Sequence, residues 1–310
     1  MVDGVLLIGF GGPTRSEEIR PFLDNILRGR PIPKERYEEV VHHYEVMGGR
    51  SPYNELTMRQ ADALRARLHR DGIEIPVVVG MRNWSPYLVD AMRELVSGVP
   101  GHRLKPVPRV LGFILAAHRC EASWERYQVA VDAARAEIGI DAPQIEYPQP
   151  WHKHPKFVEA AAARVADALA RLDQNDAKRA ELIFTAHSIP VPMDSASGYA
   201  DQIRESAAAV ASRLNRDSWT LAFQSRSGAP RDPWLEPDIG EAIRRLEGRP
   251  AIVMPIGFLC DHVEVAYDLD VEAAKIARAC GVKMIRAGTV ADHPAFIDMM
   301  AEIVRHHLNS

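Results

Sequence analysis

The amino-acid sequence predicts an α/β protein with doubly wound parallel sheets. Short apolar runs rich in Val, Ile and Phe alternate with longer segments of helical periodicity. Runs that are apolar on both faces are typical of parallel strands covered by helices on both sides. The length of 310 residues suits two domains, because one domain usually takes roughly 150 residues. The predicted strands are residues 5–10, 75–81, 109–118, 181–187, 220–225, 251–260 and 282–287.

The segments between these strands carry helix signals. Ser16 is followed by two acidic residues and indicates the start of one helix. Residues 57–69 repeat apolar side chains at helical spacing, and residues 155–172 form an Ala-rich amphipathic segment. Proline-containing stretches at 104–108 and 147–150 are the predicted crossovers between the two halves.

The composition excludes several classes of protein. The 38 basic residues are outnumbered by 42 acidic ones, so the net charge of −4 offers no basic surplus to a nucleic acid. No apolar run approaches the roughly 18 residues that a membrane-spanning helix needs, and the first residues lack a signal-peptide pattern. Three cysteines are too few for a four-thiolate iron–sulfur cluster. We therefore expect a cytoplasmic protein without a membrane span, a nucleic-acid partner or such a cluster.

Parallel α/β sheets bind ligands where their strands end at the carboxyl edge. The first strand ends in a glycine-rich turn at 9–13, which departs from the dinucleotide-binding GxGxxG pattern because Thr14 stands at the third glycine position. Another strand ends in His187, and prolines at 190 and 192 prevent regular structure from continuing. His187 is therefore either a satisfied structural residue or a functional group at the mouth of a site.

An acidic run follows the predicted strand 251–260. Glu264, Asp268 and Glu272 fall at i, i+4 and i+8, so on a helix they share one stripe. Like charges at this spacing repel each other by a few tenths of a kcal/mol per pair. We call these three residues the acidic stripe. It is either a solvated acidic face or a chain of oxygens that carries cations or protons to a buried centre.

Basic and aromatic residues lie in loops near the same strand ends. Arg28, Gly29 and Arg30 form a short basic loop, and arginine pairs with carboxylates in bidentate fashion. Aromatic side chains near these loops are suited to wall a pocket for a flat ligand. They are Phe10, Tyr44, Tyr53, Trp84, Tyr127 and Trp234.

Taken together in chain order, these motifs resemble the ferrochelatase family, and most closely its bacterial coproporphyrin III branch. The resemblance runs nearly end to end. It rests on residues 6–13, 44–52, 80–86, 186–190, 223–226, 232–235 and 261–268. Cues for the branch are the basic loop 28–30, residues 115–118 leading to Tyr127, and residues 155–158.

The resemblance implies two Rossmann-like domains with parallel sheets that face each other across a cleft. The first domain would span residues 1–113, with a C-terminal helix at about 293–310 packing back on it. The second domain would span residues 114–292 and carry His187 and Glu264.

The resemblance also implies an activity. The chain would be a lyase-type metal chelatase of heme biosynthesis that inserts Fe²⁺ into a porphyrin by ring distortion, pyrrole deprotonation and metal delivery. Coproporphyrin III is the favoured substrate and protoporphyrin IX the other candidate. Porphyrin and Fe²⁺ would be substrates of a monomer that holds no permanent cofactor.

The site residues implied by the resemblance fall into two sets. His187 and Glu264 would form the catalytic and iron-binding pair, with Asp268 and Glu272 as outer metal ligands. The expected porphyrin contacts are Phe10, Arg28, His43, Tyr44, Ser51 and Tyr127.

Two positions depart from the family pattern. Phe10 stands where some relatives place a Tyr that ligates iron axially, and its ring has no ligand atom. His43 replaces an Arg found near the propionates in some relatives. Whether His187 acts as base or as metal ligand stays open. The alternative functions are a carrier that binds tetrapyrrole or metal without chemistry, and a related cobalt or nickel chelatase.

Overall fold

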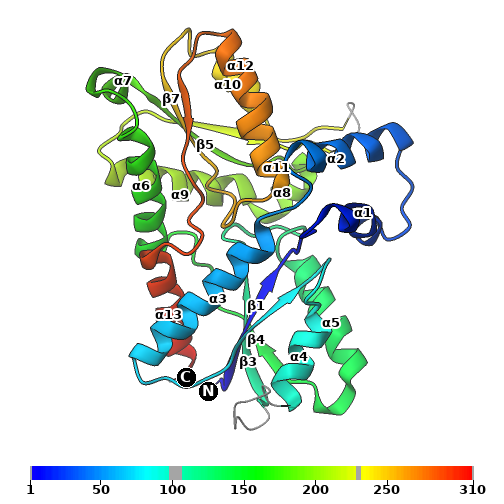
Figure 1. Ribbon diagram of the computed structural model, residues 1–310. Helices are drawn as coiled ribbons and strands as arrows, with labels where there is room; N and C mark the ends of the chain where they lie inside the picture. The colour runs from blue at the N-terminus through cyan, green and yellow to red at the C-terminus, as the bar shows by residue number, and fades with distance from the viewer. Residues whose placement is uncertain (1, 98–106, 228–231, 309–310) are drawn as a thin grey trace. The chain divides into compact units, whose positions relative to one another are not determined.

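The computed structural model describes residues 2–97, 107–227 and 232–308, which form two compact units (Figure 1). The first unit comprises Met1–Leu115, Ala122–Gln149 and Ile297–Ser310. The second comprises Ala116–Glu121 and Pro150–Phe296. Each unit contains a four-stranded sheet, and both sheets are parallel, as the sequence predicted.

The first unit has the strand order β2-β1-β3-β4. All residues of β1 and β2 are buried, because helices cover both faces of the sheet. Its strands are β1 (Gly4–Gly9), β2 (Val77–Met81), β3 (Arg109–Ile114) and β4 (Gln144–Glu146). Its helices are η1 (Ser16–Glu18), α1 (Ile19–Leu27), α2 (Lys34–Val46), α3 (Tyr53–Arg70), α4 (Leu88–Ser97), α5 (Glu125–Ile138) and η2 (Gly139–Asp141), together with most of α13 (Pro294–Leu308).

The second unit has the strand order β6-β5-β7-β8. Its strands are β5 (Glu181–His187), β6 (Thr220–Gln224), β7 (Ala251–Met254) and β8 (Met284–Arg286). Its helices are α6 (Pro155–Leu169), α7 (Gln174–Arg179), α8 (Val191–Ser197), α9 (Tyr199–Arg213), α10 (Ile239–Arg244), α11 (Val263–Ala266), η3 (Tyr267–Ala273) and α12 (Ala274–Ala279).

The two sheets share one topology, in which the first strand of each unit lies between the second and the third. In a doubly wound sheet the connections diverge at such a point, and a crevice forms beside the carboxyl ends of those strands. The divergence lies between β1 and β3 in the first unit and between β5 and β7 in the second. His187 is the last residue of β5, and the segment after β7 leads directly into α11.

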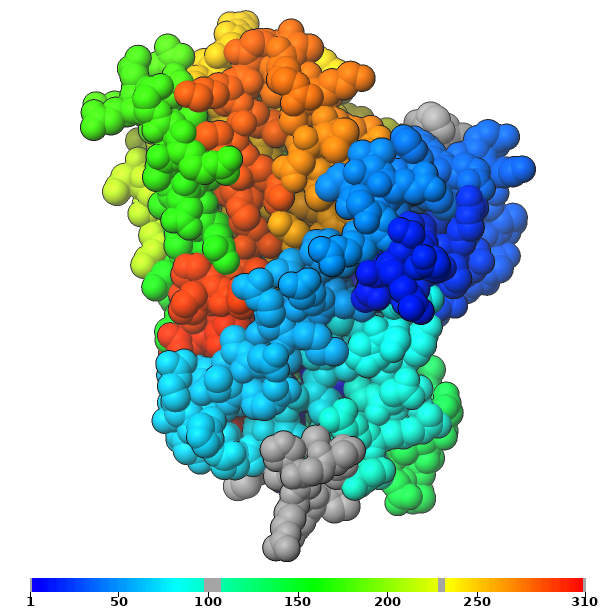
Figure 2. Space-filling view, viewed as in Figure 1, coloured from blue at the N-terminus to red at the C-terminus, as the bar shows by residue number. Residues whose placement is uncertain are grey.

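Helix α13 packs on α3 within the first unit, and Figures 1 and 2 show the two helices side by side. Arg67 binds Asp298 and Asp71, and Arg305 also binds Asp71. The Val2 amide donates a hydrogen bond to the His307 carbonyl at 3.2 Å. Residues near both ends of the chain therefore contribute contacts to the first unit.

Several element limits differ from the sequence prediction. The run 251–260 is a strand only to Met254, because Pro255 follows and cannot donate to the ladder. The run 109–118 ends as a strand at Ile114. Strand β4 was missed because two of its three residues, Gln144 and Glu146, are polar, so that it leaves no apolar run.

The division into units also differs from the predicted boundary at 113/114. Residues 122–149 belong to the first unit, because β4 pairs with β3 in its sheet. The predicted crossover at 147–150 contains the boundary between the two units, which lies between Gln149 and Pro150. In the predicted crossover at 104–108, residues 104–106 lie outside the described residues.

The close approach of Gly257 to β5 gives a prediction about stability. A Cβ atom at Gly257 would lie 2.6 Å from Ala186 Cβ and 2.8 Å from Ala186 Cα. The added Cβ would collide with the backbone of β5, which cannot move aside as a flexible side chain can. Gly257→Ala is therefore expected to lower the free energy of unfolding by about 1 to 3 kcal/mol. The measurement is urea-induced unfolding followed by circular dichroism.

Gly288→Ala is the matched control, because the nearest atom to an added Cβ, Arg164 Cδ, lies 3.9 Å away. The control variant should unfold within about 0.5 kcal/mol of the unchanged protein. Equal stabilities for the two variants would show that β5 and the segment after β7 do not pack as closely as described.

Candidate functional site

The strongest candidate for chemistry is the pair formed by His187 and Glu264 in the second unit. His187 Nε2 lies 3.5 Å from Glu264 Oε1, and the side chains are 31% and 48% exposed. His187 Nδ1 is hydrogen-bonded to the Ser188 carbonyl. Because a carbonyl oxygen only accepts, Nδ1 carries the proton and Nε2 is the atom that faces Glu264.

The environment of His187 favours its protonated form. Burial acts to lower the pKa of the imidazole, but the nearby Glu264 carboxylate, the Ser188 carbonyl and Asp268 together outweigh it and raise the pKa above the ordinary value. Nε2 can therefore accept a proton near neutral pH, or donate its lone pair to a metal when unprotonated. Both roles use the same atom.

The acidic stripe continues from this pair along one helical run. The sequence predicted an ordinary helix, whereas residues 267–273 form the π-helix η3 between α11 and α12. A π-helix has a wider turn, and such turns are frequent at functional sites. The stripe residues still lie close together, because both Glu264 and Glu272 act on the pKa of Asp268.

Asp268 is the stripe residue with the most perturbed carboxyl group. It accepts hydrogen bonds from the Ser225 hydroxyl and from Gln224 Nε2, the latter at 3.5 Å. Burial raises the pKa of Asp268 to about 7, and the neighbouring carboxylates Glu264 and Glu272 add to this rise. The bond from Ser225 and the proximity of His187 oppose it. Asp268 can therefore take up and release a proton near neutral pH.

Arg286 binds two aspartates of the segment that carries the stripe, one before it and one within it. From β8 its Nε donates to Asp270 Oδ1 at 2.7 Å and its Nη1 to Asp261 Oδ1 at 3.0 Å. Burial acts to lower the pKa of the guanidinium, but the two aspartates outweigh it and raise the pKa. The two hydrogen bonds of the Arg286 guanidinium connect the segment before α11 to η3. Neither bond goes to a residue of the acidic stripe.

The donor set is suited to transient metal contact. Among the residues that the structure describes, no group of three or more His, Cys, Asp and Glu side chains is placed to hold a metal ion. His187 and Glu264 together offer one imidazole and one carboxylate, with Asp268 next along the stripe. Two ligands bind a divalent ion more weakly than the closed four-ligand sites of structural metals.

The predicted porphyrin contacts all lie in the first unit, and two of them pack on one buried ring. Phe22 is 1% exposed and contacts Phe10 and Tyr44 edge to face, with ring centroids 6.3 and 6.1 Å apart. Trp84 packs on the same ring at 5.9 Å. Phe10 is 36% exposed, so the end of β1 presents an aromatic surface to solvent.

The other predicted porphyrin contacts are distributed around this cluster. Ser51 is buried, and its amide donates to the carbonyl of Pro13 in the turn after β1. Tyr127 is buried on α5, and its ring lies 5.3 Å from the guanidinium carbon of Arg82. His43 is half-buried on α2. Arg28 is exposed and caps α1 in a left-handed conformation.

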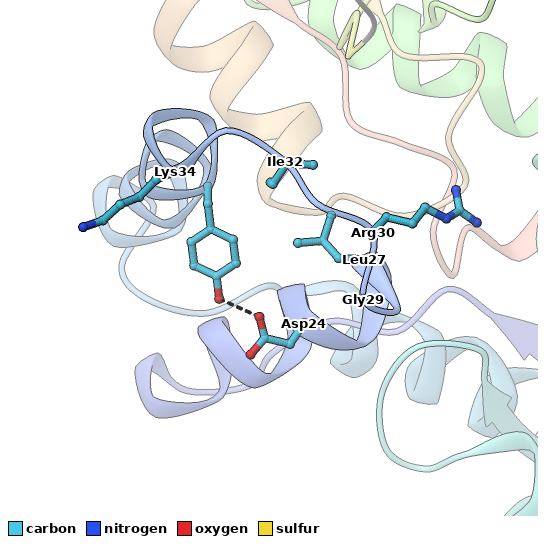
Figure 3. A pocket seen from close by; sticks show the side chains of 7 residues that line it. Asp24, Leu27, Gly29, Arg30, Ile32 and Lys34 are labelled. Atoms are coloured by element: carbon cyan, nitrogen blue, oxygen red, sulfur yellow. Dashed lines mark hydrogen bonds between the residues drawn. The ribbon is translucent and has the colours of Figure 1, made fainter.

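A pocket of about 380 Å³ lies between α1 and α2 (Figure 3). Residues of these two helices form part of the surface of the first unit (Figure 2). The Tyr37 hydroxyl closes one side by donating to Asp24 Oδ1 at 3.0 Å. Of the basic loop, Gly29 and Arg30 line the pocket but Arg28 does not. The lining residues are Asp24, Leu27, Gly29, Arg30, Ile32, Lys34 and Tyr37.

Several residues that the structure connects to these sites could not be given a role from the sequence. Gln224 and Ser225 contact Asp268, and Arg286 supports the helix that carries it. Arg82 contacts Tyr127. Gln224, Ser225 and Arg82 fall in motifs that carried the family resemblance, and those motifs were the available signal for a functional role. Their contacts with residues distant in the sequence are visible only in the fold.

Other features bear on the class of protein. Cys120 and Cys260 are buried and Cys280 is half-buried, and no disulfide joins any of the three within the described residues. Within residues 2–97, 107–227 and 232–308, no helix combines the length and the apolar character needed to cross a membrane.

Comparison with known proteins identifies one family. A model of the ferrochelatase family matches residues 2–308. A protein of Rhodopirellula baltica named ferrochelatase is 39% identical, over 99% of this chain and 86% of its own length. Proteins of Nocardia farcinica and Mycolicibacterium smegmatis, both named coproporphyrin III ferrochelatase, are 38% identical over 99% of this chain and over 89% and 90% of their own lengths.

Solved structures support the fold. CbiX, described as the terminal enzyme of siroheme biosynthesis in denitrifying bacteria, matches with a TM-score of 0.55 and 18% identity over 98% of both chains. A multi-domain protein of Deinococcus radiodurans with structural similarity to chelatases matches with a TM-score of 0.57 and 17% identity. That match covers 97% of this chain but only 54% of the Deinococcus protein.

The raised pKa of Asp268 predicts a pH-dependent effect on stability. The group holds its proton up to about pH 7 when folded but only to its ordinary value near 3.8 when unfolded. The native protein therefore loses stability as pH rises between these values, because it must ionise a buried carboxyl. Asp268→Asn removes that cost and should be more stable than the unchanged protein at pH 8, by roughly 1 to 3 kcal/mol.

Urea unfolding of the metal-free protein across this pH range is the measurement, with exposed Asp201→Asn as the control. The advantage of Asp268→Asn should shrink as pH falls toward 4. An advantage that is the same at every pH would mean that Asp268 ionises normally in the folded protein.

Proposed function

This chain belongs to the ferrochelatase family, and on that premise we propose that it inserts Fe²⁺ into a porphyrin, with coproporphyrin III as the favoured substrate. It is an enzyme of the metal-chelatase, lyase type. Two relatives that match 99% of this chain are named for coproporphyrin III, which supports that choice. The Rhodopirellula baltica relative is named ferrochelatase without a porphyrin, so protoporphyrin IX is the substrate to compare.

The observation that carries the proposal is the contact between His187 and Glu264. Insertion replaces two pyrrole N–H protons with one metal ion, so the site must accept protons beside the place where the metal is delivered. His187 Nε2 lies 3.5 Å from Glu264 Oε1, while the Ser188 carbonyl holds the proton on Nδ1. Because Nδ1 keeps its proton, Nε2 is the nitrogen that takes up a pyrrole proton, and Glu264 stabilises the imidazolium that forms.

The acidic stripe provides the exit for these protons. A carboxyl with a pKa of about 7 exchanges protons readily at neutral pH, and Asp268 is such a group next to the pair. Glu272 follows next along the stripe and is exposed. We propose that Fe²⁺ arrives along the same oxygens and is held transiently by His187 and Glu264, as a substrate and without a second, permanent cofactor.

The porphyrin is assigned to the aromatic and polar residues of the first unit. Phe10, Tyr44 and Trp84 surround Phe22, and flat rings pack well on such faces. Since Phe10 has no ligand atom, iron receives no protein ligand from that position. The ring must bend for its nitrogen lone pairs to point at the incoming metal, and binding energy from its periphery offsets that strain.

Replacement of His187 tests the proposal directly. His187→Ala removes the proton acceptor, so iron insertion into coproporphyrin III should slow by roughly a hundredfold or more, while porphyrin affinity changes little. The measurement is the collapse of the four visible bands of the free-base porphyrin under anaerobic conditions with Fe²⁺.

His69→Ala is the control, because this histidine is 73% exposed in α3 and its ion pair within the described residues is with Glu74. Turnover near the original rate in His187→Ala would refute the assigned role. If the unchanged protein binds coproporphyrin III without converting it, the carrier function replaces the enzyme. Conversion only with cobalt or nickel and another tetrapyrrole would identify a related chelatase.

A further inference from the structure

Thr185 and Gln224 are two buried polar side chains of the second sheet. Thr185 on β5 is 0% exposed, and Gln224 at the end of β6 is 1% exposed. Within the described residues, neither Thr185 Oγ1 nor Gln224 Oε1 has a hydrogen-bond partner. Buried polar atoms of this kind are nearly always hydrogen-bonded to protein or to an internal water, because an unpaired one keeps its full desolvation cost.

The register of the sheet places both side chains on one face. Strands β5 and β6 run parallel, and Thr185 is paired with Ala222. Two residues further along, His187 is paired with Gln224. Side chains of paired residues share a face, as do those of every second residue along a strand. Thr185 and Gln224 are therefore diagonal neighbours on the face of His187, with Cα atoms roughly 7 to 8 Å apart.

This face is covered by the helical run that carries the acidic stripe. Ile183 and Ala222 of the sheet belong to one buried cluster with Val265 of α11 and Leu269 of η3. Ile183 lies two residues before Thr185 and so on the same face. Ala222 ends at Cβ, so the residue paired with Thr185 offers its hydroxyl no polar side-chain atom. The two oxygens are therefore enclosed between the sheet and the helix of Asp268.

Gln224 also contacts the acidic stripe. Its Nε2 donates to Asp268 Oδ2 at 3.5 Å, and the Ser225 hydroxyl donates to the same oxygen. Ser225 adopts a left-handed conformation with φ of 63°, which is uncommon for residues other than glycine and is often found at functional sites. The end of β6 is thus shaped so that two consecutive side chains reach one carboxylate oxygen.

The amide of Gln224 has two possible orientations, and only one of them binds a carboxylate. Nε2 donates a hydrogen bond to Asp268, whereas Oε1 only accepts and would repel a carboxylate oxygen. A donor bound to Oε1 fixes the favourable orientation, because turning the amide would then break two hydrogen bonds. A water molecule is suited to this position, since it donates to Gln224 Oε1, bonds Thr185 Oγ1 as well and spans roughly 5 to 6 Å between two oxygens.

We propose that Thr185 and Gln224 bind an internal water beneath η3, and that this water fixes Gln224 as a positioning residue for Asp268. Asp268 is thereby kept directed along the acidic stripe, where Fe²⁺ arrives. The effect on iron rests on the proposed function, whereas the water and the amide orientation belong to the metal-free protein. Thr185 and Gln224 are assigned no contact with iron or porphyrin, because both act through Asp268.

A high-resolution crystal structure of the metal-free protein tests the water directly. A water within hydrogen-bonding distance of both Thr185 Oγ1 and Gln224 Oε1 is expected. It should be lost in Thr185→Val, which removes the hydroxyl, and retained in Thr185→Ser, which keeps it. A structure of the unchanged protein in which the two side chains bond each other, or other protein groups, overturns the site.

The Fe²⁺ dependence of insertion tests the positioning role. Gln224→Met keeps the length of the side chain but removes the amide, so the Fe²⁺ concentration for half-maximal rate should rise by roughly tenfold. Thr185→Val should raise it by roughly threefold, and Thr185→Ser should recover most of that loss. The KM for porphyrin should stay within about twofold. Neither effect should add to that of Asp268→Asn, because both act through this carboxylate.

Thr220→Val is the matched control. Thr220 also lies on β6, but its hydroxyl donates to Glu181 Oε1 at 2.9 Å, far from the stripe in sequence. Its Fe²⁺ dependence should equal that of the unchanged protein even where its stability falls. If Gln224→Met folds poorly, Thr185→Val decides the question, because valine has nearly the shape of threonine and suits a strand.

The outcomes separate this inference from the proposed function. If the unchanged protein inserts iron but Gln224→Met and Thr185→Val show the Fe²⁺ dependence of Thr220→Val, the positioning role is wrong and the enzyme stands. If the water is present and is lost in Thr185→Val, but the unchanged protein inserts no iron, the water site stands and the proposed function fails. An effect of Gln224→Met that persists in the Asp268→Asn background overturns the inference, because Gln224 would then act by another route.

Discussion

The contact between His187 Nε2 and Glu264 Oε1 depends on how the second sheet is built. Strand β5 ends in His187, and the segment after β7 enters the helix that carries Glu264. Strands β5 and β7 are neighbours, and the connections that leave them diverge. That divergence determines where His187 and Glu264 lie next to each other. Gly257 allows the segment after β7 to lie against Ala186. An imidazole and a carboxylate 77 positions apart in the chain (264 − 187) thus become neighbours through sheet topology alone.

The two units concentrate opposite charge for different reasons. In the second unit, Glu264, Asp268 and Glu272 lie close enough to raise the pKa of Asp268, and Arg286 binds other carboxylates instead of neutralising them. In the first unit, Arg82 lies among arginines without a carboxylate partner in the described chain. The proposed Fe²⁺ substrate accounts for the acidic cluster, because carboxylate oxygens attract a dication.

Much of the fold was predictable because buried parallel strands leave continuous apolar runs. Strand β5 was predicted to the residue, and the C-terminal helix expected at about 293–310 is α13, Pro294–Leu308. Strand β4 was missed, since polar residues flank its single Ile145, and the π-helix was missed because sequence spacing does not distinguish it from an α-helix. For the site, the spacing of the acidic stripe predicted that its three carboxylates lie on one helix face. The position of His187 at the end of a strand identified it as a candidate functional residue. The roles of Ser225, Arg286 and Arg82 depend on partners distant in the chain, which no local pattern encodes.

The central claim is that His187 and Glu264 act as one unit in iron insertion. A double-mutant cycle measures this most directly, with His187→Ala, Glu264→Gln and the double variant assayed for iron insertion into coproporphyrin III. Groups that share a step are strongly non-additive. The double variant should therefore be no more than about threefold slower than the slower single variant. Rate losses that multiply in the double variant would show that the two side chains act independently, which would contradict the account.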